Sequence, residues 1–209
     1  MPARAAQSPT INRAAINESS MDPHVMLSEW LRTTFPAGPP SPASVPPFLL
    51  PDHKGGLLCS KELQAVGPYV LTFFHGSWCP GCVRKLELLE RGLDRIHELG
   101  ADVMACSPET HAFPRNLKIE NAFRFHILSD VDCALSSNLG LAFVVPGQIR
   151  RRFAELEIDL GARHGDDRWM LPVPVTLVVD RHGAVTRTFS DVNGHINLDG
   201  IVAALSTIQ

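Results

Sequence analysis

The sequence lacks the segments that would place a protein in a membrane or send it across one. No apolar run is long enough to span a bilayer, and residues 1–20 contain no apolar stretch typical of a secretory signal peptide. Dense runs of lysine and arginine are also missing, and the formal net charge is -3. We therefore expect no membrane partner, no nucleic-acid partner and a cytoplasmic location.

Cysteines are few, and only two of them lie close together. The five are Cys59, Cys79, Cys82, Cys106 and Cys133. An odd number with one close pair is not a secreted disulfide framework, and it favours intracellular redox or metal chemistry. A structural zinc site needs four ligands, and this close pair supplies two without a second CxxC or an HxxxH elsewhere. We therefore expect neither a metal nor a cofactor.

The isolated cysteines are interpreted differently from the pair. We expect Cys59, Cys106 and Cys133 to behave as small, buried apolar residues. Cys133 also opens a predicted helix, and Cys106 ends a predicted strand.

Composition divides the chain into three stretches. Residues 1–20 are predicted to be a disordered tail, and residues 21–46 a short helix followed by a proline-rich linker. The helix is expected over Met26–Phe35, and the linker contains "PAGPPSPASVPP", which can neither continue a helix nor pair as a central strand. The main domain is expected over residues 47–209.

Apolar patterning in the main domain alternates between strands and helices. Strands are predicted over Tyr69–Phe74, Ala101–Cys106 and Phe125–Asp130, and a long amphipathic helix over Pro80–Gly100. A hairpin over residues 175–190 and a helix over Leu198–Leu205 follow. This order predicts an α/β three-layer sandwich, in which helices cover both faces of a central mixed β-sheet.

Cys79 and Cys82 lie where a predicted strand gives way to the long helix. The start of a helix offers unpaired N–H groups and the positive end of a dipole, which favour a thiolate over a thiol. Pro80 suits the first helical turn, whereas the pattern leaves open whether Arg84 and Lys85 face the sulfurs or the solvent. Two intervening residues allow one sulfur to attack and the other to resolve a mixed disulfide.

Pro174 stands immediately before a predicted strand, whose ladder it cannot join as a donor. On physical grounds alone it is equally an active-site residue or a plain loop proline.

Together these segments resemble the thioredoxin fold and, within it, the peroxiredoxin-like AhpC/TSA branch. The resemblance is carried by "VLTFFHGSWCPGC", "CSPET", "FHILSD" and "GDDRWMLPVPVTLVVDRHG", and it covers about residues 47–205. The dithiol itself is of the thioredoxin type. The resemblance implies Cys79 and Cys82 as the catalytic residues, with Trp78, Pro80 and Pro174 supporting them.

The two families imply opposite orders of attack. In thioredoxins the first cysteine is the nucleophile, which would be Cys79. In peroxiredoxins the reacting cysteine ends a Pro-x-x-x-Thr-x-x-Cys pattern, which places it at Cys82, with Cys79 at the threonine position and His75 at the proline position.

Two residues typical of these families are missing from the sequence. The peroxiredoxin arginine is absent near Pro174, so Arg84 and Arg187 are the candidates to replace it. The buried acid of thioredoxins corresponds to Phe73.

Three functions remain open at this point. The first is a thiol-based antioxidant enzyme that reduces peroxides through a dithiol/disulfide cycle, with a thioredoxin- or glutathione-type reductant resetting it. The second is a thioredoxin-type protein disulfide oxidoreductase, in which Pro174 shapes the substrate groove. The third is a non-enzymatic, redox-sensing binding domain. The sequence leaves the oligomeric state open.

Overall fold

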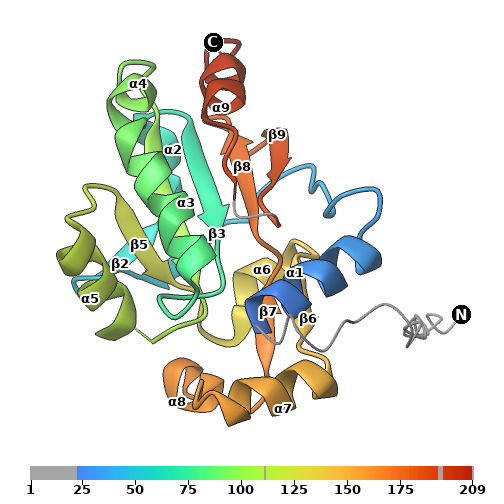
Figure 1. Cartoon of the computed structure of the whole chain (residues 1–209). Coiled ribbons are helices and arrows are strands. Elements are labelled where there is room, and N and C mark those ends of the chain that lie inside the picture. The colour runs from blue at the N-terminus through green and yellow to red at the C-terminus, as the bar shows by residue number, and fades with distance from the viewer. Residues whose placement is uncertain (1–22, 111, 193–194, 209) are drawn as a thin grey trace, which may run out of the picture.

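A mixed five-stranded sheet forms the centre of the molecule. The computed structural model describes residues 23–110, 112–192 and 195–208, so the predicted tail at residues 1–20 lies outside the described residues. The sheet has the order β5-β4-β3-β8-β9, and Figure 1 labels four of its strands, β5, β3, β8 and β9. Its strands are β3 (Tyr69–Phe73), β4 (Asp102–Ser107), β5 (His126–Ser129), β8 (Val175–Val179) and β9 (Val185–Ser190).

The pairing confirms the predicted mixed sheet. Strands β3, β4 and β5 run parallel, whereas β8 pairs antiparallel with both β3 and β9. Every residue of β3 and β8 is buried, which explains why both read as continuous apolar runs in the sequence.

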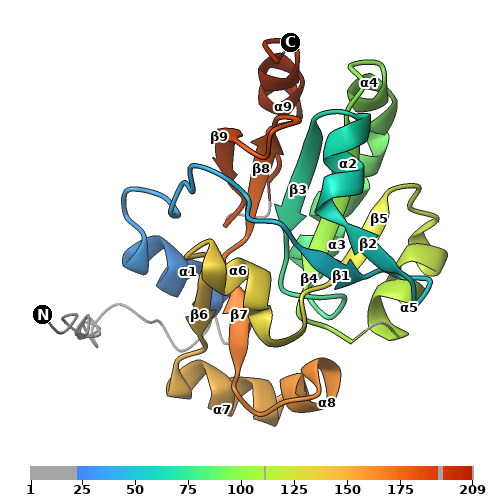
Figure 2. The same ribbon diagram turned by 180° about the vertical axis from the view of Figure 1, so that it is seen from behind.

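Helices cover both faces of the sheet, as predicted. Alternate strand residues point to opposite faces, so that Leu71 and Phe73 belong to one core cluster and Val70 to the other. The Val70 cluster is covered by α3 (Pro80–Arg91), α4 (Leu93–His97), α5 (Ala112–Asn121) and α9 (Leu198–Leu205). The Leu71 cluster is covered by α1 (Pro23–Thr34), α2 (Ser60–Val66), α6 (Ala134–Asn138), α7 (Gly147–Glu155) and α8 (Leu160–His164). Figure 2 shows α2 and α6 on the face opposite α3.

The long helix predicted over Pro80–Gly100 is divided at Gly92, which separates α3 from α4. A Cβ atom at Gly92 would lie only 2.3 Å from the side chain of Leu198 in α9. The glycine therefore permits the close approach of α9, a tertiary requirement that helical periodicity does not reveal.

Two small sheets were not predicted. They pair β1 (Leu49–Pro51) with β2 (Leu57–Cys59), and β6 (Ala142–Val144) with β7 (Met170–Pro172). Each strand has three residues, and so short a segment gives little alternation for a sequence pattern to detect.

The helix before the proline-rich segment packs onto the domain. Leu27 and Leu31 of α1 are buried in the core, and the Trp30 ring lies 5.0 Å from that of Phe143. The proline-rich segment then returns to the sheet, where Ser44 bridges to Ala184. None of the helices in the described ranges is both long and apolar enough to cross a membrane.

Candidate active site

The two close cysteines lie at the predicted junction between strand and helix. Cys79 is the N-cap of α3 and Pro80 occupies the first helical turn, where a missing N–H costs nothing. The backbone N–H of Cys82 donates to Cys79 Sγ across 3.3 Å. The sulfur thus takes the place of the side-chain oxygen that usually caps a helix.

A buried carboxylate holds the loop that leads into α3. Glu109 accepts hydrogen bonds from the Ser77 backbone N–H (2.6 Å) and hydroxyl (2.9 Å), and its ion-pair partner Arg163 lies 3.0 Å away. Burial raises the pKa of Glu109, although the Ser77 and Arg163 contacts act in the opposite direction. Because these groups come from distant parts of the chain, local sequence patterns do not reveal them.

The position of Gly76 in the same loop leaves no room for a side chain. It has φ +148°, and a Cβ atom there would lie 2.5 Å from Trp78 Nε1. The Trp78 ring stacks on His24 of α1 at 5.4 Å and meets Phe153 of α7 edge-on at 5.2 Å. Trp78 therefore links the cysteine loop to α1 and α7.

Lys85 is the main feature that the sequence pattern left undecided. It lies one helical turn beyond Cys82 and is only 1% exposed. Its ammonium donates to the Phe73 carbonyl oxygen (2.9 Å) and to Asp191 Oδ2 (3.1 Å). Thr176 also donates to Asp191 Oδ2 (2.6 Å). Lys85 thus faces the protein interior, and Asp191 supplies the buried acid that the sequence comparison missed.

One signal in the sequence pointed to a buried Lys85. It shares the buried face of α3 with Cys82, Leu86 and Leu89, and a lysine in such a stripe needs a buried partner. The partner could not be found from the sequence, because Asp191 is 106 residues away.

The surroundings make the two sulfurs unequal. Burial by itself raises the pKa of Cys82, but hydrogen bonds from the Cys79 thiol and from His75, together with the charge of Lys85, hold that pKa well below its ordinary value. The pKa of Cys79 is raised well above the ordinary value, first by its hydrogen bond to Cys82 and then by burial. The arrangement therefore favours a thiolate at Cys82 and a thiol at Cys79.

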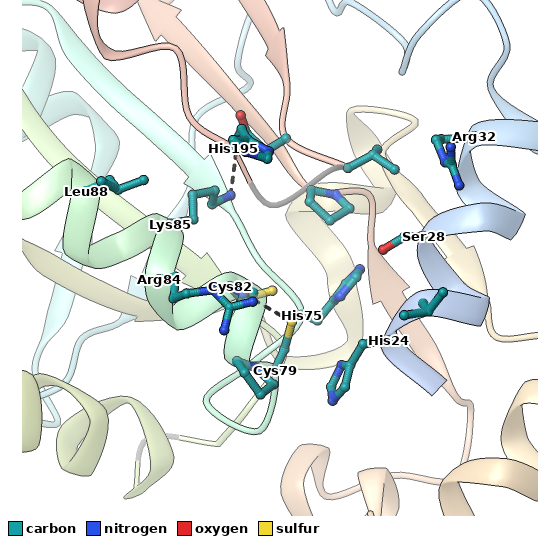
Figure 3. A pocket seen from close by; sticks show the side chains of 16 residues that line it. His24, Ser28, Arg32, His75, Cys79, Cys82, Arg84, Lys85, Leu88 and His195 are labelled. Atoms are coloured by element: carbon teal, nitrogen blue, oxygen red, sulfur yellow. Dashed lines mark hydrogen bonds and ion pairs between the residues drawn. The ribbon is translucent and has the colours of Figure 1, made fainter. Parts of the chain in front are cut away.

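A cavity of about 690 Å³ gives access to both sulfurs. Figure 3 shows His24, Ser28 and Arg32 of α1 on the opposite side of this cavity from Arg84 and Leu88 of α3. The helix of the N-terminal extension therefore forms one wall of the candidate active site.

The structure also places the remaining predicted residues. Pro174 lines the cavity, and so does Arg84. Trp78 instead packs behind the cysteine loop, against the rings described above. Arg187 lies at an exposed position of β9 and is not among the residues lining the cavity, so it does not replace the missing arginine.

Comparisons with known proteins agree with this architecture. A model of the AhpC/TSA family matches residues 43–188. Peroxidoxin BcpB from Mycobacterium tuberculosis superposes with a TM-score of 0.64 at 19% identity, covering 82% of this chain and 99% of that one. Peroxiredoxin Q from Xanthomonas campestris superposes with a TM-score of 0.59, also at 19% identity, covering 76% and 89%. No curated protein matches the sequence significantly.

The chain belongs to the AhpC/TSA family, because the matched segment covers more than half of it. It is a peroxiredoxin-like protein of thioredoxin fold. Within that class it is an oxidoreductase, a thiol-dependent peroxidase whose substrate is a peroxide and whose partner is a thiol reductant.

Proposed function

We propose that this peroxidase works through its CxxC pair, with Cys82 attacking the peroxide and Cys79 resolving the product. The observation that carries the proposal is the setting of Cys82: its sulfur lies beside the Cys79 sulfur and His75, and the charge of the buried Lys85 also acts on it. A peroxiredoxin places a threonine hydroxyl where Cys79 stands. Here a thiol supports the neighbouring thiolate instead.

In the first step the Cys82 thiolate attacks one oxygen of the O–O bond. That bond breaks, Cys82 becomes a sulfenic acid, and the leaving alkoxide or hydroxide takes a proton and departs as an alcohol or water. The fixed charge of Lys85 and the hydrogen bond from His75 supply the electrostatic support expected of an arginine at this position.

In the second step Cys79 attacks the sulfenic sulfur, a disulfide forms, and water leaves. The two sulfur atoms and a nitrogen of His75 all lie within 4.8 Å of one another, so the sulfurs are already near each other before the bond forms. One external dithiol of thioredoxin type, or two monothiols of glutathione type, then return both cysteines to the reduced state and leave as a disulfide.

The cavity favours an organic hydroperoxide as the substrate. Val25, Leu88 and Val192 supply apolar lining, and Arg32 and Arg84 lie near the same space. One of the similar proteins, the Xanthomonas campestris bacterioferritin comigratory protein, has alkyl peroxide reduction activity. We expect cumene hydroperoxide to react at least as fast as hydrogen peroxide.

A protein disulfide oxidoreductase is the second candidate, because Pro174 lines the same cavity as the cysteine pair. It requires Cys79 as the nucleophile, whose raised pKa leaves little thiolate. A non-enzymatic binding domain does not agree with the thiol-dependent peroxidase class of the chain.

Single-turnover kinetics with two serine variants test the assignment. Stopped-flow Trp fluorescence follows the reduced protein after mixing with peroxide, because Trp78 lies next to Cys79. We expect Cys79→Ser to keep a fast first turnover, since serine retains a hydroxyl at the threonine position, and Cys82→Ser to lose it. Fast oxidation of Cys82→Ser together with a slow Cys79→Ser would reverse the roles and support the disulfide oxidoreductase.

A further inference from the structure

A third potential metal ligand stands beside the cysteine pair. The two sulfurs and a ring nitrogen of His75 lie within 4.8 Å of one another, and all three residues are buried. The sequence offered only two ligands because His75 is not at a conventional metal-ligand spacing from Cys79. Folding brings the histidine in from the end of β3.

The distances are close to those of a zinc site. Ligands at the usual 2.0–2.3 Å from a tetrahedral zinc ion lie roughly 3.5–3.8 Å from each other. Shortening separations of at most 4.8 Å to this range requires rotations of side chains and no rearrangement of α3. Two thiolates and one imidazole are ligands that zinc prefers.

One ring nitrogen of His75, a residue only 5% exposed, lies beside the two sulfurs. Its Nε2 atom has no hydrogen-bond partner among the described residues. A buried ring nitrogen of this kind needs an explanation, because nearly all buried polar atoms have partners.

Charge and access also suit a divalent ion. The ammonium of Lys85 lies 3.1 Å from Asp191, so two thiolates would face the ion while the nearby lysine charge is offset in part by a carboxylate. All three ligand residues line the cavity, which leaves a fourth position for water or another small ligand. Three protein ligands and one open position are typical of catalytic zinc sites.

We propose that the reduced protein binds one zinc ion through His75, Cys79 and Cys82, and that peroxide releases it. When one peroxide and two protons oxidise both thiolates, a disulfide and two waters form and the zinc departs, because a disulfide no longer offers thiolate ligands. Zinc occupancy of the site would then depend on peroxide. This dependence rests on the proposed function, whereas zinc binding itself does not rest on it.

Cobalt(II) titration of the full-length, reduced and metal-free protein tests the site under anaerobic conditions. We expect one equivalent to bind with the intense visible bands of tetrahedral cobalt and a sulfur-to-cobalt charge-transfer band. Zinc should displace the cobalt, and one equivalent of hydrogen peroxide should then release zinc to a chromophoric chelator. Peroxide consumption by the metal-free protein is measured separately, so that a failed zinc site and a failed peroxidase assignment are distinguishable.

Matched variants decide whether these three residues are the ligands. Cys79→Ser and Cys82→Ser should each weaken cobalt binding at least about tenfold and reduce the charge-transfer band, and His75→Gln should shift the visible bands. Cys133→Ser and the exposed His97→Gln serve as controls and should change nothing. Circular dichroism confirms that each variant is folded. Octahedral cobalt spectra, or cobalt binding unaffected in folded Cys82→Ser or His75→Gln, would overturn the proposal.

Discussion

Two pairs of buried cysteines lie near the ends of neighbouring parallel strands, and different groups act on the pKa values of the two pairs. Cys79 and Cys82 follow β3, whereas Cys106 lies in β4 directly opposite Phe73, and Cys133 caps α6. Cys106 and Cys133 are almost completely buried, at 0% and 1% exposure. The exposed fraction differs little between the two pairs, because Cys79 and Cys82 are each only 6% exposed.

Hydrogen bonds and charges distinguish Cys82 from the second pair. The Cys79 hydrogen bond, His75 and Lys85 stabilise the Cys82 thiolate against its burial. Burial, reinforced by Asp130, raises the pKa of Cys133 to about 12, and the same two causes raise that of Cys106 well above its ordinary value. A buried cysteine thus keeps a thiolate only where hydrogen bonds and positive charge outweigh the effect of burial.

The largest expected effect comes from removing the nucleophile of the first pair. Cys82→Ser should lower peroxide consumption by about three orders of magnitude or more, because no other described cysteine combines cavity access with a stabilised thiolate. Steady-state peroxide consumption with an excess of reductant measures the loss. The matched control is Cys133→Ser, which should stay within about twofold of the unchanged protein. Equal losses in both variants would remove the distinction between the pairs.

The second prediction concerns the positive charge of Lys85, which lies near the first pair. Lys85→Met should slow oxidation of Cys82 by up to about tenfold at pH 7, because less of the sulfur is then thiolate while the Cys79 and His75 contacts remain. It should also destabilise the fold by about 3–5 kcal/mol, since Asp191 is left buried without its partner. Stopped-flow oxidation and urea unfolding measure the two effects.

The double variant Lys85→Met/Asp191→Asn separates these effects. It should recover much of the stability, because no charge remains unpaired, while oxidation of Cys82 stays slow. Recovery of the oxidation rate together with stability would show that Lys85 serves the fold and not the thiolate.

The third prediction concerns His164, a buried histidine on which groups near both cysteine pairs act. His164 is influenced by Asp166, which also acts on Cys133, and by His75, which acts on Cys82. Burial is the main cause that lowers its pKa from 6.5 to about 4. Above pH 6.5 both states carry a neutral ring. As pH falls towards 4 the unfolded chain binds the proton first, so folding loses about 3 kcal/mol.

Unfolding curves between pH 7.5 and 4.5 check this dependence. His164→Gln should lose less stability on acidification than the unchanged protein, whereas the exposed His182→Gln should follow it. If the free energy of unfolding falls equally on acidification in all three proteins, the buried His164 ring is not responsible for the loss.

The sequence was sufficient for features that depend on local pattern. Continuous apolar runs revealed β3 and β8, and Pro80 after Cys79 revealed the start of α3. It was insufficient for features set by distant contacts, such as the interruption at Gly92 or the Asp191 partner of Lys85. The sequence therefore located the cysteine pair but not the charges that make its two sulfurs unequal.

The smallest expected effect comes from changing the charge beside the second pair. Asp130 accepts hydrogen bonds from the Leu135 and Ser136 backbone N–H groups at 2.7 and 2.9 Å, so it caps α6 as well as acting on Cys133. Asp130→Asn keeps one acceptor but replaces the second carboxylate oxygen with a donor, so it should cost about 1–3 kcal/mol in stability. Removing the negative charge should lower the pKa of Cys133 only in part, because burial is the larger cause of the raised pKa.

Labelling of Cys133 by a small alkylating agent should therefore become a few-fold faster at pH 8. It should remain far slower than the labelling of Cys82, and peroxide consumption should be unchanged. Labelling as fast as that of Cys82 would show that one carboxylate, rather than burial, keeps this pair inert.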